Sequence, residues 1–210
     1  MLLTLRRTTA VATLPLVLIA GLIFLTACDS SDVAGIDPEE EVEEAPPLWP
    51  LEDGSTWTYD IQLSETGAET LTGTEKLTVV GSEERAGETV TTLRSEMEER
   101  DPSFSEIRTV TDGFWFSTMF IKDEAEPGDT YSFRYEGRTL EVEVSATTTT
   151  VPAGSFSVKK YTLGAEQEGF SFTADFLFAE GLGLIEYSIL EVEPGYEGQI
   201  LGRLTDSSLL

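Results

Sequence analysis

The sequence predicts an all-β domain: an antiparallel, strongly curved sheet or an incomplete barrel, with a β-sandwich as the alternative. From residue 48 onward, apolar side chains alternate with polar ones, which is the period of a half-buried strand. No stretch of this region sustains the 3.6-residue period of an amphipathic helix. Short segments containing Gly or Pro separate the apolar runs, and short turns favour antiparallel pairing.

The expected strands follow one another at short spacing. The first contains Trp57, Tyr59 and Ile61, each separated from the next by a polar residue. The most regular alternation occupies 170–178, where the aromatic residues share one face and Asp175 lies on the other. In chain order the expected strands are 56–63, 71–80, 88–98, 104–111, 113–121, 131–135, 140–144, 158–163, 170–178, 184–192 and 198–205. The expected turns between them include 65–67, 85–87, 127–129, 136–138 and 194–195.

The amino-terminal segment, residues 1–27, has the pattern of a secretory signal peptide. It contains no acidic residue, and Arg6 and Arg7 precede an apolar run from Ala10 to Leu25. This run is shorter than the about 20 apolar residues that a membrane-spanning helix needs. The segment leads into Leu-Thr-Ala-Cys at 25–28, which resembles the lipobox of bacterial lipoproteins.

The lipobox resemblance implies a covalent lipid anchor. In that family the Cys sulfur receives diacylglycerol, the chain is cut before it, and the new amino terminus is acylated, for example with palmitate. Cys28 is therefore the expected lipidation site, and two or more acyl chains anchor a protein stably. We expect the protein to be secreted across the inner membrane and lipid-anchored in the bacterial cell envelope. Asp29 resembles an inner-membrane retention signal of some lineages, so the choice between inner and outer membrane stays open.

The expected mature chain is acidic throughout. Residues 28–47 hold eight acidic and no basic residues, which predicts a disordered tether, with a ligand for a cationic partner as the alternative. Residues 48–210 form the expected β-domain and carry 31 acidic against 11 basic residues. Such a surface is typical of a protein that works in high salt, where screening reduces self-repulsion. A local cation role is the alternative.

The composition excludes several classes of site. The chain has no His and one Cys, which excludes Ser-His-Asp catalysis, an imidazole zinc site and an internal disulfide. A net charge of -26 argues against nucleic-acid binding. The acids near the turn at 127–129, from Asp123 to Asp129, lack the ordered spacing of a calcium loop. We therefore expect no cofactor and no metal.

The aromatic residues of the strands have two interpretations. The first is an ordinary sandwich or barrel core. The second is a concave sheet that encloses an apolar ligand, because the mouths of β-barrels are common ligand sites. The residues expected to line such a site are Trp57, Trp115, Phe170, Phe172 and Phe176.

Three motifs in fixed order resemble a family of bacterial lipoproteins with no assigned activity. They are Trp-Pro-Leu-x-x-Gly-x-x-Trp-x-Tyr at 49–59, Val-Pro-Ala-Gly-Ser-Phe at 151–156 and Gly-Leu-Gly-Leu-Ile-Glu at 181–186. Leu182 and Glu186 depart from the Val and Lys of the family pattern. The resemblance implies an envelope location and a curved antiparallel sheet. Physically, Pro152 and Gly154 predict a sharp corner, and Gly181 and Gly183 predict a bend, a bulge or a close approach to another backbone.

These observations together predict a non-catalytic binding or assembly module that engages an apolar ligand or an envelope protein. The alternative is a carboxylate-based hydrolase that acts on envelope glycans. The chain has no Gly-x-Ser-x-Gly elbow and no Ser-x-x-Lys motif, and its many acids make chance carboxylate pairs common. We therefore expect that the protein is not an enzyme.

Overall fold

A computed structural model of the chain describes residues 45–98, 100–116, 119–135, 138–167 and 169–210. The expected signal peptide, the lipidation site Cys28 and most of the expected tether lie outside the described residues. In the described part, all regular secondary structure is β-strand, and no helix there is long and apolar enough to cross a membrane.

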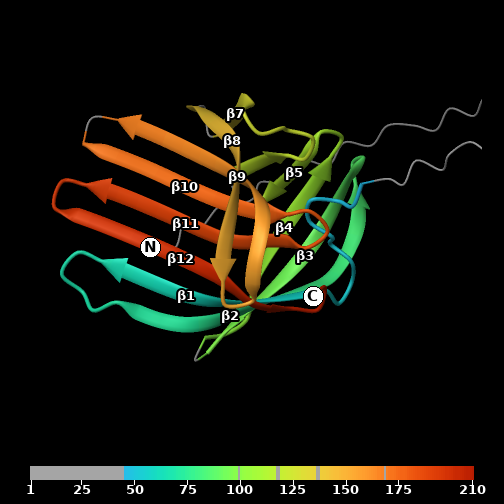
Figure 1. The fold of residues 1–210 in the computed structure, drawn as a ribbon, viewed down its shortest axis with the longest axis horizontal. Coiled ribbons are helices and arrows are strands. Elements are labelled where there is room, and N and C mark those ends of the chain that lie inside the picture. The colour runs from blue at the N-terminus through green and yellow to red at the C-terminus, as the bar shows by residue number, and fades with distance from the viewer. Residues whose placement is uncertain (1–44, 99, 117–118, 136–137, 168) are drawn as a thin grey trace, which may run out of the picture. The chain divides into compact units, whose positions relative to one another are not determined.

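The described residues form twelve strands. Figure 1 shows how these strands are arranged. Their bounds are β1 Thr56–Glu65, β2 Leu71–Arg85, β3 Glu88–Met97, β4 Ser103–Val110, β5 Gly113–Phe116, β6 Met119–Lys122, β7 Thr130–Tyr135, β8 Arg138–Val151, β9 Gly154–Gln167, β10 Phe170–Ala179, β11 Gly183–Glu193 and β12 Tyr196–Ser207. They agree in order with the strands expected from alternation, although β2, β8 and β9 are longer.

All twelve strands belong to one antiparallel sheet. Their order is β6-β5-β4-β3-β2-β1-β12-β11-β10-β9-β8-β7, so each strand pairs with a chain neighbour except where β1 pairs with β12. The sheet is strongly curved (Figure 1), and hydrogen bonds from Tyr131 on β7 to β6 show that the two edge strands lie close together. This nearly closed barrel confirms the predicted fold class in its curved-sheet form.

One expected strand is two strands in the structure. The sequence predicted a single strand over 113–121, whereas Phe116 pairs with Met119 and the chain reverses between them. Both faces of this hairpin are apolar: Phe114 and Ile121 lie in the core, and Trp115 and Phe120 pack together on the other face. Because no Gly or Pro marks the reversal and no polar face interrupts the run, the sequence pattern did not reveal it.

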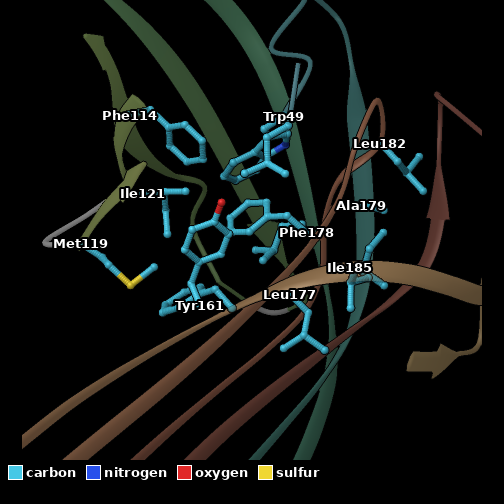
Figure 2. Packing of buried hydrophobic residues seen from close by; sticks show 14 of the residues in the cluster. Trp49, Phe114, Met119, Ile121, Tyr161, Leu177, Phe178, Ala179, Leu182 and Ile185 are labelled. Atoms are coloured by element: carbon cyan, nitrogen blue, oxygen red, sulfur yellow. The ribbon is translucent and has the colours of Figure 1, made fainter. Parts of the chain in front are cut away.

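The core is one continuous cluster of buried side chains rich in aromatic rings. Trp49, which precedes the first strand, lies at its centre, in edge-to-face contact with Trp57 at 5.6 Å and with Phe116 at 5.3 Å between ring centroids. Figure 2 shows Trp49, Phe114, Phe178 and Tyr161 converging from different elements. Such pairs contribute about 0.5–1.5 kcal/mol each beyond their burial.

Tyrosine hydroxyls complete the closure between β6 and β7. The Tyr131 hydroxyl donates to the Phe120 carbonyl at 2.9 Å and accepts from the Lys122 amide at 3.2 Å. The Tyr161 hydroxyl donates to the Lys122 carbonyl at 3.1 Å. The backbone groups of edge strand β6 therefore bond to side chains, which leaves them less free to pair with another chain.

Candidate functional site

The sheet divides where β11 and β12 cease to pair. Their pairing runs from Glu193 and Tyr196 to Glu186 and Arg203. Beyond it, the Leu182 carbonyl accepts from Trp57 Nε1 at 2.7 Å, and the Leu184 carbonyl accepts from the Tyr59 hydroxyl at 2.8 Å. Buried carbonyls need partners, and these two fully buried side chains supply them.

The first and third sequence motifs meet at this end of the domain. The Gly181 amide donates to the Pro47 carbonyl at 2.9 Å, and the Trp49 ring covers Gly183. Both glycines have positive φ: Gly181 (+74°) lies in the turn between β10 and β11, and Gly183 (+95°) is the first residue of β11. The group that lies close to Gly183 is the aromatic side chain of Trp49, whereas the sequence predicted another backbone, and a Cβ at this position would displace the ring.

The second motif forms the two-residue turn between the long strands β8 and β9. Val151 pairs with Gly154, and the amide of Ala153 donates to the Leu204 carbonyl at 3.0 Å. This bond ties the turn to β12 beyond the point where β11 leaves it. The three motifs thus have structural roles in this fold, around the place where the sheet divides.

The residues expected to line an apolar ligand site lie in three different environments. Trp57 is fully buried and Phe176 is 7% exposed, and both are part of the packed core. Trp115 contacts Phe120 and Phe133 near the junction of β6 and β7, under the Arg108 guanidinium. Phe170 and Phe172 are half-buried near the start of β10. The structure therefore brings Phe172 and Phe176 onto one face of β10, whereas it does not gather all five residues round one space.

An apolar strip that the sequence analysis did not identify lies on the core-facing side of the sheet. It consists of Leu71, Leu63, Ile200 and Ile189, which are directly paired across β2, β1, β12 and β11. The same row continues into the core through Ala174 on β10. Leu71 is 59% exposed and Ile200 is 37% exposed, while Leu63 and Ile189 are half-buried.

The outer side of the strip is bordered by acids. Glu65 and Glu191 both pair with Gly198, so they form the next row on the same face. Glu193 follows on β11, opposite Tyr196. Burial raises the pKa of the Tyr196 hydroxyl, and the charges of Glu65, Glu191 and Glu193 raise it further. We refer to these three glutamates as the acidic border.

A polar group lies on the inner side of the strip. The Glu75 carboxylate accepts from the Tyr187 hydroxyl at 3.1 Å and from Ser95 Oγ at 2.5 Å. Burial, with the Glu75 charge as the next cause, raises the pKa of Tyr187 far above its usual value. The Tyr187 ring lies over Gly202, where an added Cβ would meet it at 2.2 Å. The strip is thus bounded by carboxylates on both sides.

The acids near the β6–β7 connection form a turn in the structure. The Glu126 amide donates to Asp129 Oδ2 at 2.9 Å, and Asp123 lies beside the Lys159–Glu180 ion pair, whose atoms are 3.2 Å apart. Burial raises the pKa of Asp123 to about 6, and the Lys159 charge opposes this. No group of metal-ligating side chains is found among the described residues.

The strip was missed because its members come from four strands that are far apart in the sequence. Alternation within a strand shows only that Leu63 shares a face with Ile61, and that Ile200 shares a face with Gly198 and Gly202. The register that pairs Leu63 with Ile200 depends on how β1 meets β12, and a shift at Thr58/Tyr59 alters that register. The signal present in the sequence was the absence of any basic residue from 188–202.

Comparisons with known proteins gave two structural similarities. The sequence matched no protein-family model and no curated protein. One similar structure is described as an exported protein with a YmcC-like fold from Bacteroides fragilis, at 14% identity and a TM-score of 0.48, covering 78% of this chain and 99% of that one. Another is described as a lipoprotein from Parabacteroides distasonis, at 10% identity and a TM-score of 0.43, covering 79% of this chain and 100% of that one. The function proposed below rests on the residues of this chain.

Proposed function

We propose that the protein is a lipid-anchored, non-catalytic binding module of the bacterial cell envelope, which engages an envelope protein through the apolar strip. The observation that carries this proposal is the continuous row from Leu71 to Ile189, open at one end and continuous with the core at the other. Leu71 and Ile200 in this row are exposed, and Leu63 and Ile189 are half-buried. Contiguous exposed apolar patches mark interaction sites.

A protein partner fits the strip better than an enclosed small ligand. Ligand pockets bury most of the surface of their ligand, whereas Leu71 and Ile200 are open to solvent. Trp57 and Phe176, which were expected to line a ligand cavity, are in contact with the core instead. An apolar face on another protein would cover the strip without any rearrangement of that core.

The anchor is supported by the sequence at 25–28 and has its own test. Changing Cys28→Ser should move the protein from the membrane fraction to the soluble fraction, because the acyl chains supply the membrane affinity. Fractionation of cells followed by immunoblotting measures this. Unchanged membrane retention of the variant would contradict the proposed anchor.

The binding role is tested by photocrosslinking in cells. A photoreactive amino acid in place of Ile200 should form a crosslink to an envelope protein. The matched control carries the same amino acid in place of Phe104, which is 65% exposed on the opposite face of the sheet. Equal crosslinking from both positions would contradict a role for the strip. A crosslink from position 200 to a small apolar molecule would show that the strip binds a ligand and not a protein.

A further inference from the structure

The strand segments that carry the apolar strip and its border hold charge of only one sign. The segments that form this part of the sheet, 62–72, 165–175 and 188–202, contain no Lys or Arg. Lys76, Lys160 and Arg203 are the nearest basic residues in the chain, and alternation turns all three to the opposite face. There Lys160 Nζ lies 3.0 Å from Asp175, and Arg203 Nε lies 3.7 Å from Glu186.

Among the described residues, none of the three acids beside the strip forms an ion pair with a Lys or Arg side chain. Glu65 and Glu193 are exposed and Glu191 is half-buried, directly next to Leu63 and Ile189. An apolar surface with such a border attracts a partner of opposite charge and repels one of the same charge. The border thus selects among the apolar surfaces that could cover the strip.

We infer that the occupant of the apolar strip is a cationic amphipathic segment of the partner protein, with an apolar face on Leu63, Ile200 and Ile189 and with Lys or Arg side chains opposite the acidic border. This inference rests on the proposed function and specifies its partner. Burial of the strip would supply affinity, and the glutamates would orient the segment and exclude acidic competitors.

The same charges disfavour other occupants of the strip. A second copy of this chain would place one acidic border against another, and the β-domain already carries 31 acids against 11 bases. An anionic lipid headgroup or a free fatty acid would bring a further negative charge to Glu65 and Glu191. Of these apolar occupants, only a segment with basic side chains has a charge that is complementary to the acidic border.

The inference is tested with three defined peptides and the full chain held in phosphatidylcholine nanodiscs, with empty nanodiscs as the blank. The cationic peptide has two repeats of Leu-Lys-Lys-Leu-Leu-Lys-Leu; its Lys residues are replaced by Ser in a neutral peptide and by Glu in an acidic one. We expect the cationic peptide to bind about tenfold more tightly than the neutral one and the acidic peptide to bind most weakly. Calorimetry measures the three affinities.

Matched variants assign the binding to the strip and its border. The double variant Leu71→Ser, Ile200→Ser should bind the cationic peptide about tenfold more weakly than the unchanged protein does. Phe104→Ser, on the opposite face, should bind it with unchanged affinity. Glu65→Gln with Glu191→Gln should remove the preference for the cationic peptide. Glu141→Gln with Glu143→Gln, exposed on β8, is the charge-matched control.

Two negative outcomes have different meanings. If the neutral and cationic peptides bind equally and both depend on Leu71 and Ile200, the cationic partner is excluded and the proposed function stands. If no peptide responds to the changes at Leu71 and Ile200, the strip is not a binding surface, and both proposals are overturned.

Discussion

Gly183 lies directly against the ring of Trp49 in the core. A Cβ at this position would lie 2.2 Å from Trp49 Cδ1 and 2.6 Å from Nε1, and the backbone φ is +95°. Trp49 cannot retreat easily, since it also contacts Trp57, Phe114 and Phe178. The glycine is therefore required by both the backbone conformation and the packing.

Gly183→Ala should destabilise the domain by about 3 kcal/mol, from overpacking and from the unfavourable φ together. Urea unfolding measures the difference. The control is Gly164→Ala on β9, where a Cβ would meet no atom within 4 Å and where we expect a change within about 0.5 kcal/mol. Equal stabilities of the two variants would refute the role of the Trp49–Gly183 contact.

Asp123 is the carboxyl whose titration should be visible in stability. Its Oδ1 atom is buried and has no hydrogen-bond partner among the described residues, and burial raises its pKa from 3.8 to about 6. The folded state then binds this proton more tightly than the unfolded state. The group therefore stabilises the fold at low pH, and this contribution is lost as the pH rises from about 4 through 6.

Asp123→Asn should accordingly stabilise the domain at pH 7 by about 1 kcal/mol, after allowing for solvent screening, and by much less at pH 4. Urea unfolding at pH 4, 5.5 and 7 tests this. Asp60→Asn, at an exposed position on β1, serves as the comparison variant. A difference between Asp123→Asn and the unchanged protein that is the same at all three pH values would contradict the prediction.

At the scale of the elements, the short strand β6 depends on tyrosine side chains from β7 and β9, which supply hydrogen-bond partners for the backbone groups along its free edge. Tyr131→Phe removes the hydroxyl that bonds to Phe120 and Lys122 and should cost about 1–2 kcal/mol. The Lys122 amide should also exchange its hydrogen faster. Denaturant unfolding and amide exchange measure the two effects, with Tyr196→Phe, a more exposed tyrosine, for comparison. Unchanged exchange at Lys122 would disprove the bond.

The strands themselves were largely predictable from the sequence. Alternation identified β1 and β10 and placed Asp175 on the polar face, where it accepts from Thr162 at 2.7 Å. Turn residues gave the hairpin boundaries between most strands. Prediction failed where alternation carries no information. β5 and β6 are apolar on both faces, and β8 continues through the run of threonines at 147–150, which pairs with the first part of β9.

The candidate site was less predictable, because it depends on register. Alternation assigned Phe172 and Phe176 to one face but could not tell which side chains of β1, β11 and β12 would stand beside them. The glycines at 198 and 202, on either side of Ile200, are covered by the side chains of Tyr196 and Tyr187, and alternation within one strand does not reveal this. The residues that lie together in the apolar strip are therefore different from the aromatic residues that the sequence predicted to line a ligand site.

For the whole molecule, the distribution of charge is the property with the broadest consequence. Many of the acids lie on outward faces, such as Glu141 and Glu143 on β8, and the ion pairs of Arg85 and Arg94 are at the surface. Exposed pairs of this kind contribute little to stability. Repulsion among unpaired acids should therefore be the larger electrostatic effect.

Raising NaCl from 0.1 to 1 M should increase the melting temperature by about 3–6 °C, because screening relieves about 1–2 kcal/mol of this repulsion. Differential scanning calorimetry measures it. The Glu141→Gln and Glu143→Gln double variant should show a smaller increase, which separates screening from a general effect of salt on apolar burial. A melting temperature independent of NaCl would exclude adaptation of this surface to high salt.

The packing of Trp49 determines how a mechanical load enters the domain. The chain from Pro47 to Trp49 is held by the Gly181 amide and by the aromatic rings before it reaches β1. A pull applied from the amino-terminal side would therefore act first on the centre of the core and on the turn between β10 and β11. The force would reach the β1–β2 hairpin, which carries Leu63 and Leu71, only afterwards, so the apolar strip would stay intact while the contacts of Trp49 break.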